Sequence, residues 1–330
     1  MHDIRKDSLT GDWVIIAANR ADRPIEYQTL YQRKSVAPCP FCLGNEQQTP
    51  AAIKAYHNGR KEPWLVRVVP NKYPALYAGE TNGAANAQHE LFPSTPAIGH
   101  HEVIIESPRH VTSLSELTDE ELSCTMQAYM DAVARCRCDQ NIRSATIFKN
   151  CRFEAGASIE HAHSQFISLP VVTAQIQHRI DACRTYFEQT GKLLQQDMLE
   201  FELRQQSRIV HTQGDFVVYC PYASRAPFQI CVTYRGWPSE FESMDEPQAN
   251  ELAWLLRKAV KALETALHEP AYNLIIQLAP LSLEHNNFYH WYVEIFPRVT
   301  RAAGLEWGTE CWINPIPPES AAQRLRALDW

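Results

Sequence analysis

The sequence has no long, uninterrupted run of apolar residues. No stretch approaches the roughly 18 apolar residues that a membrane-spanning helix needs, so we expect no membrane association. Residues 1–7 are charged from the start and hold no apolar segment of the kind found in secretory signal peptides. From these two absences we expect a cytoplasmic protein.

Basic residues are also fewer than acidic residues. Lysine and arginine together number 31 against 38 acidic residues, which gives a formal net charge of -7. Proteins that bind nucleic acid through its phosphate backbone carry a surplus of basic residues, so we expect no nucleic acid partner. A local basic cluster can still hold a small phosphate ester. The 330 residues, 45% of them hydrophobic, suffice for one large domain or two ordinary ones.

Cysteine, in contrast, is present ten times. In a reducing compartment we expect buried thiols and metal ligands rather than a disulfide framework. Cys39 and Cys42 form a Cys-x-x-Cys motif in a turn flanked by prolines, which brings two sulfurs to one point. This arrangement is half of a tetrahedral zinc site and requires two further ligands. A thioredoxin-like redox pair is the alternative, but that pair normally begins a helix after a buried strand.

The segment Ala155–Leu169 carries two histidines and a glutamine at alternate positions, His161, His163 and Gln165. In a strand, residues two apart share a face, so these side chains would line one surface. A turn of small residues comes before them and consists of Gly156, Ala157 and Ser158. One imidazole can be a nucleophile or base, its neighbour can bind a metal, and the turn can receive phosphate oxygens. The alternative is a strand with incidental polar residues, but the turn and the glutamine favour a functional site.

Two predicted strands end near a histidine. The strand over 101–106 ends shortly before His110, and the strand that begins at Ser144 leads through a loop to His161. Between them, Thr118 and Glu121 predict a capping box at the start of a helix. His110 and His161 are therefore candidates for the two remaining zinc ligands.

Two arginines are candidate phosphate-binding residues. Arg20 and Arg23 follow a predicted strand and directly precede a proline that ends regular structure. The guanidinium fork pairs with phosphate oxygens in a fixed geometry, which suits a substrate oxyanion. The alternative interpretation is a solvated loop.

The second half of the sequence repeats the pattern of the first. After a predicted pair of helices over 174–206, strands and a helix over 246–267 recur in the same order. His161 follows His110 by 51 residues, and His290 follows Ser239 by 51 residues. Tyr292 and Glu294 then stand opposite His163 and Gln165. We therefore expect the working site in the first half and a scaffold in the second.

Together these motifs resemble the galactose-1-phosphate uridylyltransferase family of the histidine-triad superfamily, including relatives that act on ADP-glucose. The motifs span nearly the whole chain: Arg-x-x-Arg-Pro at Arg20, Cys-x-x-Cys at Cys39, Pro-Asn-x-Tyr-Pro-Ala-Leu at Pro70, Ser-Pro-x-His at Ser107, Asn150 with Gly-Ala-Ser at Gly156, and His-x-His-x-Gln at His161. The tail, with Gly304–Thr309 and Ile313–Glu319, looks most like the ADP-glucose phosphorylase-like branch.

The resemblance implies a fold and a domain organisation. The expected class is α+β, with two tandem histidine-triad-like domains made of mainly antiparallel sheets with helices packed on them. The catalytic domain with the zinc site would cover 1–172, a helical connection 173–206, and a degenerate second domain 207–330. Family members are commonly dimers, so a homodimer is also implied.

The resemblance also implies roles for the residues of the site. His163 would attack the α-phosphorus of a nucleotide sugar, expel a sugar 1-phosphate and carry the nucleotide to an acceptor phosphate. Gln165 would mark a transferase. A structural Zn²⁺ would be held by Cys39, Cys42, His110 and His161. Substrate binding would fall to Arg20, Arg23, Asn71, Asn150, Gly156, Ala157, Ser158 and Gln165.

Three functions are compatible with this pattern. A uridylyltransferase that takes UDP-glucose and a hexose 1-phosphate is the first expectation. An ADP-glucose phosphorylase-like enzyme would use the same histidine but deliver AMP to inorganic phosphate. A zinc- or nucleotide-binding module without catalytic activity is the third possibility, and an activity screen separates it from the other two.

Overall fold

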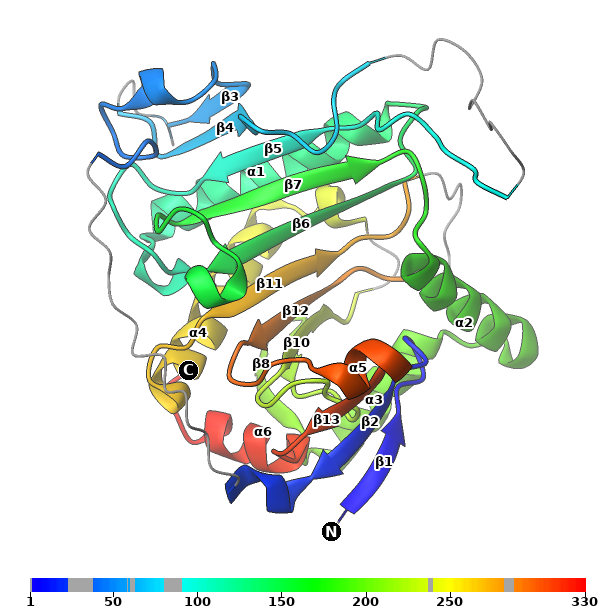
Figure 1. The fold of residues 1–330 in the computed structure, drawn as a ribbon. Coiled ribbons are helices and arrows are strands. Elements are labelled where there is room, and N and C mark those ends of the chain that lie inside the picture. The colour runs from blue at the N-terminus through cyan, green and yellow to red at the C-terminus, as the bar shows by residue number, and fades with distance from the viewer. Residues whose placement is uncertain are drawn as a thin grey trace.

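The computed structural model describes residues 2–22, 38–57, 59, 63–79, 91–236, 240–281 and 288–330. Arg23 and Ser239 lie outside these ranges. The chain forms a ten-stranded antiparallel sheet and a small three-stranded sheet, with helices packed around them (Figure 1). The expected α+β class is confirmed.

The first half contributes five strands to the large sheet and one long helix that packs against it. They are β3 (Lys54–Tyr56), β4 (Val66–Pro70), β5 (His101–Ile105), α1 (Asp119–Arg137), β6 (Ser144–Cys151) and β7 (His163–Leu169). The capping box at the start of α1 is confirmed. The hydroxyl of Thr118 accepts from the Glu121 N–H, and the Glu121 carboxylate accepts from the Thr118 N–H at 2.8 Å.

The second half repeats this set of elements. It comprises β8 (Ile209–Gln213), β9 (Phe216–Tyr219), β10 (Ile230–Tyr234), α4 (Glu246–Leu267), β11 (Tyr272–Gln277) and β12 (Tyr292–Pro297). Two helices join the halves as expected, α2 (Ala174–Thr190) and α3 (Leu194–Gln205).

The ends of the chain build the small sheet against the second half (Figure 1). Its strands are β1 (His2–Lys6), β2 (Trp13–Ala17) and β13 (Cys311–Asn314), and its helices are α5 (Gly304–Thr309) and α6 (Pro318–Arg326). β13 runs parallel to β2, whereas β1 pairs with β2 in the antiparallel sense.

The strand order of the large sheet confirms the internal repeat. From one edge to the other it runs β3-β4-β5-β7-β6-β11-β12-β10-β9-β8, so each half has the same order counted outward from the centre. β6 and β11 pair antiparallel at the centre, where Phe148 lies opposite its counterpart Ile275. The domain boundaries at 172 and 207 stay a prediction, because the hydrogen-bonded sheet continues from one half into the other.

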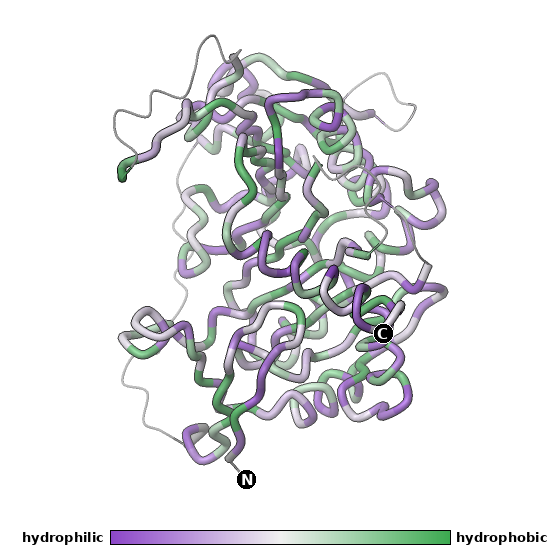
Figure 2. Tube along the Cα trace, turned by 90° about the vertical axis from the view of Figure 1, so that its right-hand side faces the viewer, coloured by the Kyte–Doolittle hydropathy of each residue, from purple (hydrophilic) through white to green (hydrophobic). Residues whose placement is uncertain are grey.

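One hydrophobic core serves both halves. α1 and α4 pack against one another on the same side of the sheet, and the largest buried cluster contains residues from both. Tyr129 and Phe166 come from the first half, and Leu252 and Trp291 from the second. Figure 2 shows hydrophobic segments through the interior, whereas hydrophilic segments are frequent on the outer helices and loops.

Alternate residues of β7 face opposite sides of the sheet. Phe166 lies in the core beneath α1, and Ser164 is hydrogen-bonded to Tyr129 of that helix. By strand alternation, His163 and Gln165 belong to the other side. Our expectation that His161 shares this strand was wrong, because β7 begins at His163. The residue between the histidines bonds to a neighbouring loop instead, where the Ala162 N–H donates to the Val111 carbonyl.

Candidate active site and metal centre

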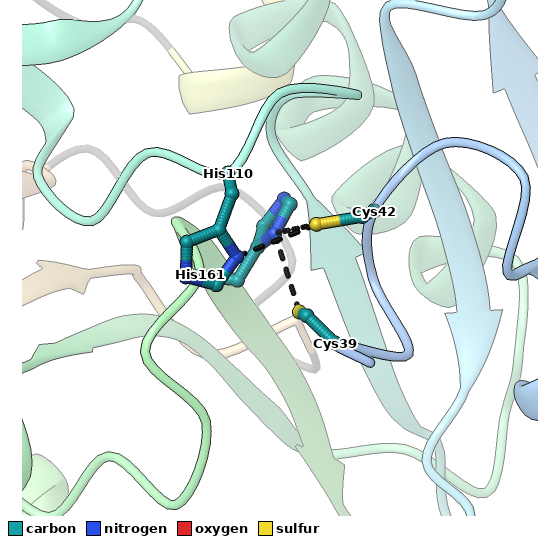
Figure 3. A group of neighbouring side chains, drawn as sticks. All are labelled: Cys39, Cys42, His110 and His161. Carbon is teal, nitrogen blue, oxygen red and sulfur yellow. Dashed lines mark hydrogen bonds between the residues drawn. The ribbon is translucent and has the colours of Figure 1, made fainter. Parts of the chain in front are cut away.

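Four predicted metal ligands converge near the end of β5 and the start of β7. The ligand atoms of Cys39, Cys42, His110 and His161 all lie within 4.8 Å of one another. Figure 3 shows the two sulfurs and the two imidazoles directed at one point. The Nδ1 atom of His161 is 3.5 Å from the Cys39 sulfur and 3.6 Å from the Cys42 sulfur. The Nδ1 atom of His110 is 3.3 Å from the Cys42 sulfur.

These distances fit a tetrahedral metal ion. Zinc bonds of about 2.3 Å to sulfur and about 2.0 Å to nitrogen place the two ligand atoms about 3.5 Å apart. The tautomer of His161 fits as well. Its Nε2–H donates to the Ser107 carbonyl at 2.8 Å, so its Nδ1 lone pair faces the cysteines. The four residues could therefore hold a metal ion, with two sulfur and two nitrogen ligands.

The local turn that carries the cysteines is fixed by its own hydrogen bonds. The Cys42 N–H donates to the Cys39 carbonyl at 3.3 Å, and the Asn45 side chain donates to the same carbonyl at 2.8 Å. Gly44 has a φ of 89°, which a side chain would disfavour. These backbone contacts and the glycine hold the two cysteines on one tight turn.

The protonation of the cluster also depends on its surroundings. Burial raises the pKa of the Cys42 thiol to about 11, and the neighbouring Cys39 adds to this effect. Burial lowers the pKa of His161 to about 4, so its imidazole is neutral at pH 7. A cation between the sulfurs would favour the thiolate forms, because it offsets the repulsion between them.

His163 lies directly beside this cluster and is 6% exposed. Its Nδ1 is 2.7 Å from the carbonyl oxygen of His161, which can only accept a hydrogen bond. The proton therefore sits on Nδ1, and Nε2 keeps its lone pair. Burial lowers the pKa of His163, which favours the neutral, nucleophilic imidazole. The ring of Phe41 contacts both imidazoles edge-on, with centroids 5.9 Å from His161 and 5.2 Å from His163.

A buried ion pair supports the backbone of His163 from the core side. Lys149 on β6 and Glu106 at the end of β5 are 1% and 0% exposed at their side chains, and their charged atoms are 2.5 Å apart. Lys149 also donates to the His163 carbonyl at 3.3 Å. Glu106 accepts from the hydroxyls of Tyr129 and Ser164. Burial opposes ionisation of Glu106, but Lys149 and these hydroxyls bring its pKa below the ordinary value.

Gln165 is oriented by a histidine that the sequence analysis did not select. The Nδ1 of His101 accepts from the Ala75 N–H at 3.1 Å, so its proton is on Nε2. That Nε2–H donates to the Gln165 side-chain oxygen at 2.7 Å, and the Asn71 amide lies 3.4 Å from the same oxygen. With its oxygen engaged on this side, Gln165 can present its NH₂ group to a substrate.

Asn150 and the turn of small residues also lie together. Gly156 takes a left-handed conformation with a φ of 96°, beside the Asn150 amide. The N–H groups of Gly156 and Ala157 donate to the carbonyls of Phe153 and Arg152, respectively. Because both N–H groups are already hydrogen-bonded, they could receive phosphate oxygens, as we expected, only if the turn rearranged. Ser158, which is exposed, is the remaining candidate of the turn.

A residue of the second half holds this arrangement. The Asn273 side chain on β11 donates to the Asn150 side-chain oxygen and to the Ala155 carbonyl, each at 2.8 Å. Asn273 and His101 contact the predicted site residues, and Lys149 and Glu106 lie behind them, but the sequence alone did not single out these four. The charged pair had a signal, because each residue interrupts or ends an otherwise apolar strand.

Of the two arginines of the first motif, the structure describes only Arg20. Arg20 lies in a short 3₁₀ helix, Ala18–Asp22, and is exposed. That helix follows β2 of the small sheet, and none of the described hydrogen bonds or ion pairs joins Arg20 to the residues above. Arg23 lies outside the described residues, so its role in binding stays a prediction.

In the parts of the chain that the structure describes, no helix has the length and apolar character needed to span a membrane.

Comparison with known proteins identifies the family. The family model of the galactose-1-phosphate uridyl transferase N-terminal domain matches residues 1–173. ADP-glucose phosphorylase from Arabidopsis thaliana is 32% identical over 99% of this chain and 93% of its own length. Galactose-1-phosphate uridylyltransferase from Thermotoga maritima is 24% identical and covers 100% of this chain and 99% of its own length.

Solved structures agree with these matches. The crystal structure of an Arabidopsis thaliana ADP-glucose phosphorylase with bound ADP-glucose has a TM-score of 0.85 and 30% identity, with full coverage of both chains. A uridylyltransferase structure has a TM-score of 0.76 and 25% identity, and covers 99% of this chain and 98% of its own. The chain therefore belongs to the galactose-1-phosphate uridyl transferase family and is an enzyme of the nucleotidyltransferase class.

Proposed function

We propose that the enzyme transfers AMP from ADP-glucose to inorganic phosphate through a covalent intermediate on His163. The observation that carries the proposal is the tautomer of His163, whose Nδ1–H donates to the His161 carbonyl and leaves Nε2 as a nucleophile. ADP-glucose is chosen because the relative at 32% identity and the structure at TM-score 0.85 both carry the name ADP-glucose phosphorylase. The first expectation from sequence, a UDP-glucose donor, becomes the second candidate.

In the first step, the Nε2 lone pair of His163 attacks the α-phosphorus of the nucleotide sugar. A P–N bond forms as the P–O bond to the β-phosphate breaks, and glucose 1-phosphate leaves with the bonding electrons. The neutral imidazole becomes positively charged, and the carbonyl of His161 stabilises the Nδ1–H of that cation.

In the second step, an oxygen of inorganic phosphate attacks the same phosphorus. A new P–O bond forms, the P–N bond breaks, and the electron pair returns to Nε2 of His163. ADP leaves and the neutral imidazole is restored. Splitting one transfer into two displacements lets a single histidine serve both.

Charge develops on the phosphoryl oxygens in both steps and requires donors close to His163. Gln165 supplies its NH₂ group, which is oriented because its oxygen accepts from His101 at 2.7 Å. The Ser158 hydroxyl and the Asn150 amide are the other donors that we assign to the phosphates or the ribose. Fixed donors aimed at developing charge are usually a large part of such a rate enhancement.

We assign Zn²⁺ to the cluster of Cys39, Cys42, His110 and His161, in a structural role. Four protein ligands complete a tetrahedral zinc, which leaves no position for substrate. The ion would fix His161, whose carbonyl orients His163. A homodimer and a cytoplasmic location remain our predictions from the family resemblance and the composition.

A uridylyltransferase that takes UDP-glucose and hexose 1-phosphate is the second candidate. The family model bears that activity in its name, and the Thermotoga maritima relative spans the full chain. Both candidates use the same residues for chemistry, so they differ only in donor and acceptor.

Intact-protein mass spectrometry separates the two candidates. The enzyme is incubated without acceptor, with ADP-glucose in one sample and UDP-glucose in the other, and His163→Ala is the control. We expect an adduct of AMP mass on the wild type that is absent from the variant and disappears when phosphate is added. An adduct of UMP mass alone would select the second candidate, and no adduct from either donor would reject the covalent mechanism.

A further inference from the structure

The second half contains a cavity of about 530 Å³ that the proposed reaction does not use. It lies over the side of β10 and β12 that carries Thr233 and Tyr292, and is closed by α3 and by the turn between β1 and β2. A cavity of this size is typical of a site for a small organic ligand.

The position of the cavity in the fold is the counterpart of the catalytic site. Tyr292 begins β12 as His163 begins β7, and Glu294 follows it as Gln165 follows His163. The orienting contact is also repeated. Gln229 donates to a Glu294 carboxylate oxygen at 3.0 Å, in the way that His101 donates to Gln165. The second half has thus kept the strand arrangement and the orienting contact of the first half. It carries different side chains at the positions of His163 and Gln165.

Tyr292 is a lining residue of this cavity that has an unsatisfied polar group. The residue is 5% exposed and lines the cavity, and its hydroxyl has no hydrogen-bond partner among the described residues. A buried hydroxyl without a partner is unfavourable, so native proteins rarely leave one unpaired. A hydroxyl, carbonyl or amide of a bound molecule would satisfy it.

The charged residues that line the cavity include four carboxylates, Asp7, Asp197, Glu202 and Glu294, against three cations, Lys6, Arg208 and Arg225, and this balance disfavours a phosphate-bearing ligand. Arg208 is paired with Glu202 at 2.9 Å and with Glu319 at 2.8 Å. Arg225 lies 3.4 Å from Glu294 and 3.5 Å from Asp12. Both lining arginines therefore already face carboxylates, and Glu294 stands where the catalytic half has a neutral glutamine. A bound phosphate would be repelled by the Glu294 carboxylate. Glu294 occupies the position that corresponds to Gln165, which is proposed to bind phosphate in the first half.

The remaining lining favours a ring with hydroxyl groups. Tyr186, Phe201, Tyr219 and Tyr222 contribute aromatic surface in addition to Tyr292. Aromatic rings pack against the flat, less polar faces of other rings, and polar side chains at the edge fix their hydroxyl groups. We propose that this cavity binds an uncharged, hydroxyl-bearing ring compound, either a nucleoside or a free pyranose sugar.

Isothermal titration calorimetry on the full chain tests this site with adenosine, uridine, glucose and galactose, each up to about 10 mM. Tyr292→Phe removes the hydroxyl and keeps the ring, and we expect it to weaken binding roughly three- to tenfold through the loss of one hydrogen bond. His163→Ala, in the other half, should leave this binding unchanged. Nucleoside and sugar are distinguished by which of the four compounds binds.

A second measurement locates the ligand without any substitution. Hydrogen exchange of the wild-type backbone should slow over 7–10 and 194–202 when the bound compound is added, because these segments line the cavity. The proposal is overturned if none of the four compounds binds, if binding survives Tyr292→Phe unchanged, or if binding is lost in His163→Ala. It is also overturned if AMP binds as tightly as adenosine in a Tyr292-dependent manner.

Discussion

At the scale of single residues, His101 sets the orientation of Gln165. Gln165 is proposed to contact the substrate, whereas His101 is not. His101 accepts a backbone N–H on Nδ1 and donates from Nε2 to Gln165, so its two nitrogens have fixed roles. Without that donor, the Gln165 amide can rotate and turn its oxygen toward the phosphoryl group. His101 is therefore a positioning residue for Gln165.

Replacing His101 by phenylalanine should slow formation of the His163 adduct about tenfold, which corresponds to the loss of one oriented hydrogen bond. We expect little change in substrate affinity, because the Gln165 side chain remains in place. Single-turnover mass spectrometry at varied donor concentration measures both quantities. His100→Phe, at the adjacent half-buried position, is the control, and equal effects of the two variants would contradict the assignment.

The metal cluster yields a second prediction at this scale. Cys39→Ser should reduce bound zinc from about one per chain toward zero and lower the stability by about 3 kcal/mol, or roughly 4 °C in melting temperature. The reason is that a structural ion binds only the folded chain. Elemental analysis and thermal unfolding measure the two effects.

The matched control is Cys138→Ser, because Cys138 is an exposed cysteine outside the cluster. It should retain both metal and stability. If Cys39→Ser also retained them, the zinc assignment would be wrong.

The sequence predicted the metal ligands better than it predicted the residues that orient the other side chains of the site. Cys39 and Cys42 were identified from their short spacing, and His110 and His161 were candidates because each lies near the end of a predicted strand or the loop that follows it. The family resemblance then joined the four into one set. His101 and Asn273 were not identified, since each is a single polar residue in a strand whose partner is distant in sequence. Asn273 reaches Asn150 across 123 positions, and only the pairing of β6 with β11 brings them together.

At the scale of secondary-structure elements, the ion pair of Lys149 and Glu106 joins β5, β6 and β7 behind the site. It lies entirely within the core, where an unpaired charge is strongly unfavourable. The pair also reaches α1 through the Tyr129 hydroxyl. Its function is to hold the start of β7, and hence the backbone of His163.

The effects of removing the two partners should therefore not be additive. Lys149→Met should lower the free energy of unfolding by roughly 3–5 kcal/mol, because Glu106 is left buried and charged. The double variant Lys149→Met, Glu106→Gln should be at least about 2 kcal/mol more stable than the sum of the single changes predicts. Urea unfolding of the four proteins provides the cycle.

An exposed pair gives the comparison for this cycle. Glu200 and Arg204 lie four residues apart on α3 at 3.8 Å, with both side chains at least half exposed. Arg204→Met should change stability by less than about 0.5 kcal/mol. Additive effects within the Lys149 and Glu106 cycle would show that the pair does not act as a unit.

Helices were predicted more accurately than the exact ends of strands. α1 was predicted from the capping box of Thr118 and Glu121, and α4 from the repeated pattern over 246–267; both signals are local in sequence. The start of β7 was misplaced by two residues. Its boundary depends on the pairing of Ala162 with Val111, which is a tertiary contact without a local sequence signal.

At the scale of the whole molecule, the two halves share both their sheet and their core. The Tyr272 hydroxyl of the second half accepts from the Leu114 N–H of the first at 3.1 Å, inside the protein. α1 packs on α4 across the centre. Neither half can separate without exposing the apolar surface and the strand edge that the other covers.

We therefore expect the full chain to unfold in a single cooperative transition. Calorimetry should give a van't Hoff enthalpy close to the calorimetric enthalpy, as for one cooperative unit. Residues 1–172 expressed alone should fail to show native-like protection from hydrogen exchange in β6. Two resolved transitions, or a folded first half, would mean that the domains predicted from sequence are independent after all.

The internal repeat was visible in the sequence because strand and helix patterns recur in order. How the repeats associate was not, since equal patterns are compatible with separate sheets or with one continuous sheet. The structure forms one continuous sheet because the equivalent strands β6 and β11 pair edge to edge, with Phe148 opposite Ile275. The alternating apolar pattern of each strand predicts which face is buried, but it gives no indication of which strand edge is occupied.

The meeting of β6 and β11 also matters while the protein is being synthesised. The last residue of β11, Gln277, leaves the ribosome 126 residues after Cys151, the last residue of β6. At about 5–20 residues per second, the nascent first half spends roughly 6–25 s with its β6 edge unpaired. An unpaired strand edge can pair with the edge of another chain, so until β11 emerges the β6 edge is open to association between nascent chains.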